Sequence, residues 1–311
     1  MKTSDLEIQG NNDNEIIEKE YPIIPSYKKD NIPLVFACND KYAAFTVAAI
    51  KSILYISSDR YNYDIVVLFS ELSTESKFKI SNSIKQNKNT KLRFFDVSKH
   101  LENYKFMLPQ LEHVSMETYY RLLIPSIFSN YAKVIWLDSD IIVKKDISEL
   151  YKVDIQSNFI AGCTDIGWRL QYNENRRSQI YAASTLKLSK HSNYFQAGVL
   201  VFNIGEINKK FKKEDILEAA TKHNYQFADQ DILNMLFNGN VYYLDINWNI
   251  CSNVYEVIYT DDTNIYLPQE LRALYKEAHK NPYIIHYAGG VKPWDDISMD
   301  FAHEFWKFYS A

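Results

Sequence analysis

The sequence predicts an α/β protein with parallel strands, and three observations support this class. Short apolar runs alternate with segments whose apolar residues recur every three or four positions, as strands alternate with helices in a parallel sheet. The chain has 311 residues, 46% hydrophobic and 24% charged, which is enough material for a large core. The acidic sequence Asp138-Ser139-Asp140 directly follows one apolar run. Ligands of open α/β sheets bind at the carboxyl ends of strands, so this position predicts a binding site.

The N-terminal part of the chain predicts a tail followed by alternating strands and helices. Residues 1–31 show no sustained apolar period and predict a flexible tail, so we expect a single domain over 32–311. Right-handed crossovers then connect parallel strands. The expected elements, in order, are a strand at Pro33–Cys38, a helix at Tyr42–Leu54, a strand at Asp64–Phe69, a helix at Ser73–Asn87 and a strand at Leu92–Phe95.

The remainder of the chain continues the same alternation without internal repeats or a low-complexity linker. A helical stretch at Glu117–Leu123 is expected to stop before Pro125. The aromatic, amphipathic segment Phe301–Tyr309 is expected either to pack on the body or to touch another surface. The other expected elements are strands at Lys133–Leu137, Phe159–Cys163, Tyr194–Asn203 and Tyr283–His286, and helices near Glu214–His223 and from Asp229 onward.

Composition excludes several classes of function. The formal net charge is -4, and the 35 Lys and Arg residues form no broad basic patch, so we expect no nucleic-acid partner. Cys38, Cys163 and Cys251 are odd in number and contain no CxxC pair, which argues against a disulfide framework and a zinc site. The polar N-terminus does not resemble a signal peptide, and no run approaches the roughly 18 apolar residues of a membrane span. We therefore expect a cytoplasmic protein.

The two commonest phosphate-binding loops, GxGxxG and GxxxxGK[ST], are missing, so a bound nucleotide would need another phosphate holder. Asp138 and Asp140 are two positions apart at a strand end, where alternate residues face one side. Two such carboxylates can hold Mg²⁺ or Mn²⁺, with substrate phosphates completing the shell. The alternative is a solvated turn with a helix-capping Asp.

A second candidate site lies near the C-terminus. His286 ends an apolar strand, and Gly289, Gly290 and Lys292 follow it. This order suits a third metal ligand, a backbone that approaches a ligand closely, and a lysine that binds phosphate. The alternative is a structural histidine followed by a tight turn.

Four segments occur in the order expected of glycosyltransferase family 8, namely Asp138-Ser139-Asp140, Phe195–Val199, Asp229–Leu233 and His286–Trp294. The chain resembles a bacterial member of that family over about Ile32–Trp306. Relatives include the retaining galactosyl- and glucosyltransferases of lipopolysaccharide synthesis and, more distantly, glycogenin. The resemblance implies a GT-A fold, in which a Rossmann-like nucleotide-binding half with a mixed central sheet is fused to an acceptor-binding part.

The resemblance also implies roles for residues at the matching positions. The metal ligands would be Asp138, Asp140 and His286, holding Mn²⁺, or Mg²⁺ as the alternative. The catalytic candidates are Asp229 and Gln230, which approach the donor sugar. The donor nucleotide-sugar would contact the two aspartates and Ala37, Asn39, Lys41, Arg121, Ser139, Gln196, Ala197, Gly289 and Lys292.

Several further positions either allow a second interpretation or differ from the residue that is usual in the family. Asp165 resembles an acidic residue of the acceptor side, or is an exposed loop aspartate, and His113 is a further donor-site candidate. Asp229 could also act as a helix N-cap, with Asp231 in the first turn. The family commonly has Asn where this chain has Gln196, which moves the amide by about one methylene, and Asn39 and Lys41 also differ from the expected Asp and Asn.

The implied function is transfer of a hexose, glucose or galactose, from a UDP-sugar to an acceptor hydroxyl on a cell-surface glycan, a glycolipid or a glycoprotein, with retention of configuration. Double displacement and same-face substitution both remain open. Peripheral contact with the inner membrane face is an additional expectation, whereas oligomeric state cannot be read from the sequence. One rival is a haloacid-dehalogenase-type phosphatase, although Ile142 stands where that class predicts Thr or Val. A second rival is a UDP-sugar-binding protein of the same fold without turnover.

Overall fold

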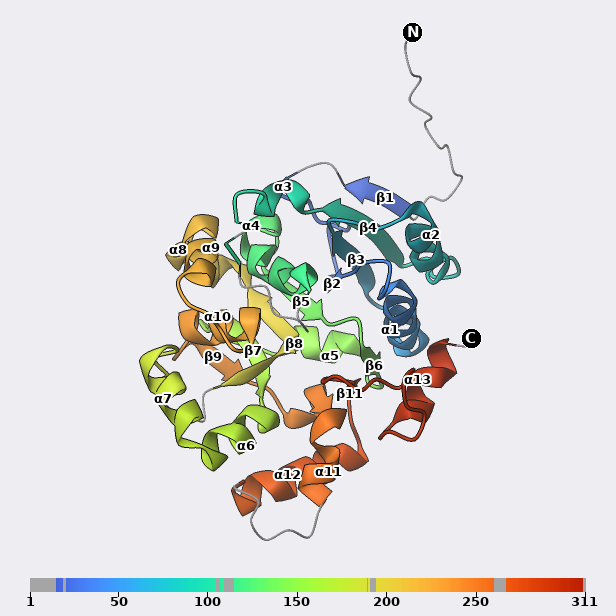
Figure 1. Cartoon of the computed structure of the whole chain (residues 1–311). Helices are drawn as coiled ribbons and strands as arrows, with labels where there is room; N and C mark the ends of the chain where they lie inside the picture. The colour runs from blue at the N-terminus through green and yellow to red at the C-terminus, as the bar shows by residue number, and fades with distance from the viewer. Residues whose placement is uncertain are drawn as a thin grey trace.

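The computed structural model describes residues 15–18, 21–104, 107–108, 115–188, 190, 194–259 and 267–309, and it contains two sheets (Figure 1). The strands of the larger sheet lie in the order β1-β4-β3-β2-β5-β8-β7-β9. Their bounds are β1 Glu15–Glu18, β2 Asn31–Ala37, β3 Asn62–Phe69, β4 Thr90–Asp96, β5 Lys133–Leu137, β7 Ile160–Thr164, β8 Phe195–Asn203 and β9 Val241–Tyr243. The smaller sheet has the order β10-β11-β6, with bounds Ile250–Cys251, Ile284–His286 and Ile141–Val143.

Helices cover both faces of the larger sheet (Figure 1). On one face lie α1 (Ala43–Ile56), α2 (Thr74–Asn82) and α5 (Ile147–Lys152). On the other lie α3 (Ser98–Leu101), the 3₁₀ helix η1 (Met116–Leu123), α4 (Ile124–Ile127), α8 (Ile204–Lys210), α9 (Lys213–Thr221) and α10 (Ala228–Leu236). The remaining helices are α6 Ile166–Glu174, α7 Arg176–Ser184, η2 Ile246–Asn249, η3 Ser252–Val254, α11 Tyr255–Tyr259, α12 Gln269–Lys280 and α13 Ala302–Tyr309.

The α/β class predicted from the alternation is confirmed, and the larger sheet is mixed. Strands β4, β3, β2 and β5 pair in parallel, as strand-helix alternation requires. β8 lies antiparallel to both β5 and β7, and β9 again pairs in parallel with β7. The antiparallel β8 is what brings Gln196, Ala197 and Gly198 beside the end of β5.

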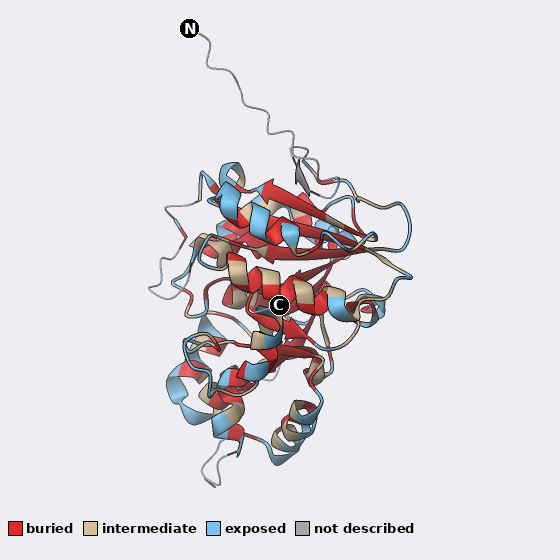
Figure 2. Ribbon diagram, turned by 90° about the vertical axis from the view of Figure 1, so that its right-hand side faces the viewer, coloured by how far each residue is buried: buried red, intermediate tan, exposed pale blue. Residues whose placement is uncertain are grey.

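The core has two layers because successive residues of a strand face opposite sides of the sheet. On β2, Leu34 and Phe36 pack in the layer beneath α1, whereas Val35 packs in the layer that contains Tyr119 and Tyr120 of η1. Figure 2 shows the strands almost wholly buried and the helices exposed along their outer sides. The polar residues at the carboxyl ends of these strands are therefore held on a rigid frame.

Residues 15–18 and 21–31 differ from the predicted tail. β1 pairs in parallel with β4, Ile23 is fully buried, and the Ile23 N–H donates to the Ile127 carbonyl at 2.9 Å. The Ser26 hydroxyl donates to the buried carboxylate of Asp64 at 2.9 Å. The folded part therefore begins before Ile32, and only 1–14 and 19–20 of the predicted tail lie outside the described residues. A few contacts separated by polar residues produce no apolar period, which is why the sequence did not reveal them.

Two local predictions also need correction or completion. The 3₁₀ helix η1 ends at Leu123, before Pro125, as predicted, but α4 follows without a break and has Pro125 in its first turn, where its missing N–H is not needed. The C-terminal segment forms α13 and packs on the body, where Phe305 is buried and Trp294 stacks on Phe45 of α1 at 3.4 Å between ring centroids. Within the described part of the chain, no helix is both long and apolar enough to cross a membrane.

Candidate active site

Two strand ends bring a histidine and two carboxylates together. Asp138 follows β5, Asp140 precedes β6, and His286 ends β11, which pairs with β6 so that His286 lies opposite Ile141. The His286 Nε2 atom is 3.4 Å from Asp140 Oδ1 and 3.7 Å from Asp138 Oδ2. One ligand atom from each residue lies within 4.8 Å of the others. Residues separated by nearly 150 positions in the sequence thus form one cluster.

This cluster fits a hard divalent cation. Burial lowers the pKa of His286, but Asp140 outweighs burial and raises that pKa to about 10. Burial acts to raise the pKa of Asp140, yet Lys292 and His286 hold it well below its usual range. A proton on His286 therefore balances the carboxylates when no cation is bound. Two carboxylate oxygens and one imidazole nitrogen are a donor set that Mn²⁺ and Mg²⁺ accept, with Mn²⁺ more tolerant of nitrogen.

The absence of a side chain at Gly198 leaves room for His286 and Asp138 to lie close together. A Cβ atom at Gly198 would overlap the His286 ring at Cε1 and would lie 2.8 Å from Asp138 Oδ2. The Asp138 N–H donates to the Gly198 carbonyl at 2.8 Å, which fixes the two strands at this separation. Any side chain at Gly198 would therefore fill the cradle between two of the three candidate metal ligands.

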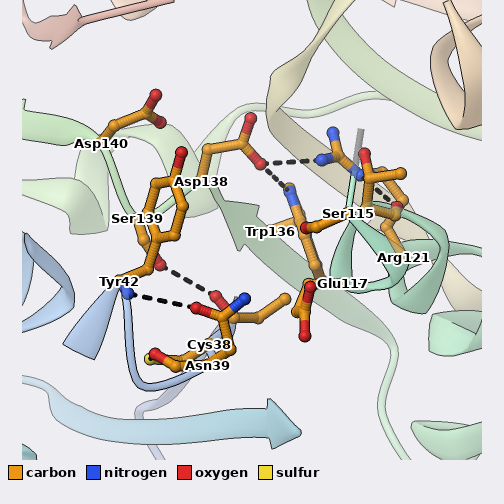
Figure 3. Close-up of a pocket in the computed structure, with 12 residues that line it drawn as sticks. Cys38, Asn39, Tyr42, Ser115, Glu117, Arg121, Trp136, Asp138, Ser139 and Asp140 are labelled. Carbon is orange, nitrogen blue, oxygen red and sulfur yellow. Dashed lines mark hydrogen bonds and ion pairs between the residues drawn. The ribbon is translucent and has the colours of Figure 1, made fainter. Parts of the chain in front are cut away.

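Arg121 links the cluster to the predicted catalytic residues. Its Nη2 atom is 2.9 Å from Asp138 Oδ1, its Nε atom is 2.8 Å from Asp229 Oδ2, and Nη1 donates to the Ala197 carbonyl. The guanidinium also lies over the Trp136 ring, whose Nε1 atom donates to Asp138 Oδ1 at 2.9 Å (Figure 3). Arg121 is thus held in place by contacts on three sides, and its charge is shared between the carboxylates of Asp138 and Asp229.

A cleft extends from the cluster along the end of β2, and the part shown in Figure 3 carries most of the residues predicted to bind the nucleotide. It is lined by Ala37, Asn39, Tyr42, Arg121, Asp138, Ser139 and Asp140, together with Cys38, Ser115, Glu117, Thr118 and Trp136. The Asn39 carbonyl Oδ1 accepts from the Tyr42 N–H at 3.2 Å, and the Ser139 hydroxyl donates to the Ala37 carbonyl at 2.9 Å. Lys41, which was also predicted at the nucleotide, is exposed and outside this lining, with its Nζ atom 5.9 Å from the centroid of the Tyr42 ring. His113 lies outside the described residues.

A second hollow shares Thr118, Arg121, Asp138 and Asp140 with this cleft, and we call it the donor hollow after the role predicted for its residues. Its lining contains the three candidate metal ligands and the predicted residues Arg121, Gln196, Ala197, Asp229, Gln230, Gly289 and Lys292, as well as Thr118, Gln226, Phe227, Ala228 and Ala288. Lys292 donates to Asp140 and to the Tyr287 carbonyl, which aims its ammonium at the cluster. At Gly289, φ is +94°, a conformation that a side chain would disfavour, and a Cβ there would press on Asn253 at 3.0 Å.

Asp229 is a buried member of the donor hollow and not a helix cap. Burial raises its pKa to about 6, opposed by the charge of Arg121 and by the Thr118 hydroxyl that donates to it. The alternative of Asp229 as an N-cap is wrong, since Asp229 lies inside α10 and the Phe227 N–H donates to Asp231 at 2.8 Å. The N-cap residue of α10 is Phe227, whose N–H is bound by Asp231 from within the helix, and Asp229 is left to face the site.

Gln230 and Asp165 connect the donor hollow to a third hollow. Gln230 Oε1 accepts from the Ala197 N–H at 2.8 Å, and Gln230 Nε2 donates to Asp165 Oδ2 at 2.8 Å. Asp165 is also the N-cap of α6, accepting from the Trp168 N–H at 2.9 Å. Asp165 is thus neither an exposed loop residue nor free, and burial raises its pKa. We call the third hollow the acceptor hollow after the role predicted for Asp165. Its lining residues include Asp165, Trp168, Gln171, Gln196, Phe227, Gln230 and Asn249.

Sequence reasoning missed a polar relay behind His286. His286 Nδ1 and Asn249 Oδ1 are 3.0 Å apart, and the Asn249 amide donates to Gln196 Oε1 at 2.6 Å. If His286 Nδ1 carries the hydrogen, Nε2 faces the carboxylates as a ligand should. Nothing in the sequence indicates Asn249, because η2 brings it to the site only through packing. Trp136, by contrast, could have been inferred from its position two residues before Asp138 on a strand.

Comparisons with known proteins agree with this geometry. A family model described as "Glycosyl transferase family 8" matches residues 33–298. The chain is 22% identical over 275 residues to General stress protein A of Bacillus subtilis, covering 86% of this chain and 89% of that protein. It is 27% identical to Glycosyltransferase GlyF of Streptococcus pneumoniae, covering 89% of this chain and 60% of that protein.

Solved structures show the same fold. The bifunctional glycosyltransferase WbbM in its apo form superposes with a TM-score of 0.81 at 31% identity, covering 93% of this chain and 51% of that one. Galactosyltransferase LgtC in complex with donor and acceptor sugar analogs gives a TM-score of 0.71 at 25% identity, covering 90% of this chain and 95% of that one. The fold is GT-A, as the resemblance implied, whereas this chain spans only about half of WbbM.

Proposed function

The chain belongs to glycosyl transferase family 8, and on that premise we propose that it transfers a hexose, glucose or galactose, from a UDP-sugar to an acceptor hydroxyl with retention of configuration. The observation that carries this proposal is the position of the cluster of Asp138, Asp140 and His286. The cluster lies where the cleft along the end of β2 meets the donor hollow. In that position the cluster lies where a diphosphate would connect a nucleoside to a sugar.

The residues around the cluster are suited to a leaving diphosphate. A divalent cation, Mn²⁺ by our proposal and Mg²⁺ as the alternative, would offset the negative charge that develops on the leaving phosphate when bound by Asp138, Asp140 and His286. Lys292 adds a second positive group, and its contact with Asp140 holds it in place before substrate arrives. Ala37 and Asn39, at the other end of the cleft, would lie beside the uridine.

The contacts of Asp229 and Gln230 favour same-face substitution over double displacement. One Asp229 oxygen accepts from the Thr118 hydroxyl, the other is ion-paired with Arg121 but accepts no hydrogen bond, and the Gln230 amide oxygen already accepts from Ala197. Neither group is a free carboxylate of the kind that forms a glycosyl-enzyme in retaining glycosidases. The anomeric C–O bond to the β-phosphate would break, the acceptor oxygen would bond to the same face, and its proton would pass to a β-phosphate oxygen.

The acceptor would be a hydroxyl of a cell-surface glycan, glycolipid or glycoprotein presented in the acceptor hollow beside Asp165, with lipopolysaccharide synthesis as the process. We further propose a cytoplasmic location, with peripheral contact at the inner membrane face as an addition. The donor identity is the first of these points that experiment can decide.

The test is metal-dependent release of UDP from UDP-glucose, UDP-galactose or UDP-N-acetylglucosamine, measured with Mn²⁺ or EDTA for the natural protein, Asp140→Ala and the exposed control Asp59→Ala. We expect release from one hexose donor, loss in EDTA and in Asp140→Ala, and no change in Asp59→Ala. Anomeric proton couplings of the product, measured by NMR once an acceptor is found, would establish retention. UDP-sugar binding without turnover over a broad acceptor panel would instead indicate the binding protein of this fold.

A further inference from the structure

A fourth hollow, which we call the distal hollow, adjoins the acceptor hollow, and none of the three candidate metal ligands lines it. It is lined by Gln171, Asn175, Arg177, Ser178, Gln226 and Phe227. Gln171 also lines the acceptor hollow, and Gln226 also lines the donor hollow. Phe227 lines all three. The three hollows therefore form one branched surface that meets at a single aromatic ring.

Phe227 is held at this junction with its ring accessible. It remains 37% exposed and meets Trp168 edge to face, with 5.9 Å between ring centroids and 89° between planes. The next residue, Ala228, has φ of +45°, a left-handed conformation that is uncommon for a residue with a side chain. That turn directs Phe227 to the surface while Asp229 faces Arg121. The backbone conformation thus keeps an apolar ring at the meeting point.

The polar lining of the distal hollow is available for hydrogen bonding. The side-chain amides of Gln171 and Gln226 make no hydrogen bond to any described residue, and Arg177 forms no ion pair within the same part of the chain. Asn175 caps α7 by accepting from the Ser178 N–H, which fixes the rim of the hollow. No carboxylate lines it. A lining of one aromatic ring, amides and one guanidinium suits a ligand with apolar C–H faces and oxygen acceptors, and it disfavours a cation.

We propose that the acceptor is a glycan of at least two sugar units, neutral or acidic, which occupies the acceptor and distal hollows together. The accepting unit lies beside Asp165 and Gln230, and the following unit packs against Phe227 with its hydroxyl or carboxylate oxygens bound by Arg177 and Gln171. This inference rests on the proposed function, since it takes the donor sugar to be delivered from the cluster side.

Arg177 and its neighbour Arg176 provide a matched pair of variants. Both are exposed at the start of α7, but only Arg177 lines the distal hollow. The probe is an array of monosaccharides and their di-, tri- and tetrasaccharide extensions, read for bound protein in the presence of UDP and Mn²⁺. UDP binding is titrated for every variant beforehand by calorimetry. The array thereby reports on acceptor length and the titration on the donor site.

We expect at least one disaccharide to bind about tenfold more tightly than its accepting monosaccharide, and Arg177→Ala to weaken that binding by about tenfold, the effect of one charge-assisted hydrogen bond. Arg176→Ala should match the natural protein, and both variants should bind UDP normally. Equal binding of monosaccharide and extension, equal behaviour of the two arginine variants, or no binding to any glycan with intact UDP binding overturns this inference alone. Absence of metal-dependent UDP binding in the natural protein would overturn the proposed function instead.

Discussion

The proposed donor side and the proposed acceptor side of this molecule differ in how their polar groups are paired. Around the cluster, charged groups already bind one another, with Arg121 between Asp138 and Asp229 and Lys292 on Asp140. Across Phe227, the amides of Gln171 and Gln226 make no hydrogen bond to the described residues. A preorganised donor side can stabilise charge without rearrangement, whereas an unpaired acceptor surface can change its specificity without disturbing the fold. Substitutions should therefore reduce metal binding and UDP release most near the cluster and least at its periphery.

The largest effect is expected from Gly198→Ala. The added Cβ would overlap the His286 ring and crowd Asp138, so Mn²⁺ affinity and UDP release should both fall by more than about a hundredfold. Mn²⁺ binding can be measured by electron paramagnetic resonance and UDP release by a coupled assay. Gly205→Ala is the matched control, because a Cβ there meets only Asn203 Oδ1 at 4.0 Å. A Gly198→Ala protein with normal Mn²⁺ affinity would contradict the predicted cradle.

A smaller effect on Mn²⁺ binding is expected from substitution of Asn249, which contacts His286 Nδ1. Asn249→Ala removes the partner of His286 Nδ1 and should weaken Mn²⁺ binding by about 10- to 100-fold, as loss of a ligand-orienting hydrogen bond does elsewhere. Asn249→Asp keeps an oxygen for His286 Nδ1 but loses the amide that donates to Gln196, so it should recover part of the affinity. Asn247→Ala, on the same helix but bonded to Asn281, controls for stability. If Asn249→Asp is as weak as Asn249→Ala, orientation of His286 is not what Asn249 provides.

The pH dependence of UDP release should report the ionisation of Asp229. Because burial raises the pKa of Asp229 to about 6, the group loses its charge as the pH falls through that value. If the carboxylate form is required, UDP release should fall as the pH drops below 6, approaching about tenfold per pH unit, and should become constant from about one pH unit above that value. Asp229→Asn should be slower at neutral pH but should lack this acidic limb. An unchanged limb in Asp229→Asn would assign it to another group.

The smallest effect is expected at Lys41. The resemblance placed Lys41 at the nucleotide, but the structure has it exposed over Tyr42 and outside the cleft lining. Lys41→Ala should therefore change the KM for the UDP-sugar by less than about twofold, as exposed charges contribute little. Lys292→Ala, whose ammonium contacts the cluster, is the comparison and should raise that KM strongly. A large effect of Lys41→Ala would mean that the cleft closes over the nucleotide when it binds.

Residues of the proposed donor side were easier to predict from the sequence than those of the proposed acceptor side. The candidate metal ligands and Lys292 were predicted from short motifs at strand ends, where position along one strand decides which way a side chain points. Asp229 was predicted as a donor-side residue or a helix N-cap, and the structure has it inside α10, where Phe227 is the N-cap residue. Asn249 and Phe227 were not predicted, since neither belongs to a local pattern that distinguishes it from a core or surface residue. Their roles arise from contacts between distant segments.

The sequence by itself determined the α/β class, the order of most strands and helices, and the identity of the cluster at the ends of β5 and β11. These follow from periodicity and from spacing within single elements, which are local properties of the chain. The tertiary structure alone decided that β8 runs antiparallel, that residues 21–31 join the fold, and that Gly198 leaves room between Asp138 and His286. Each of these depends on which distant segments pack together, because burial and close approach are shared between elements and no single element specifies them.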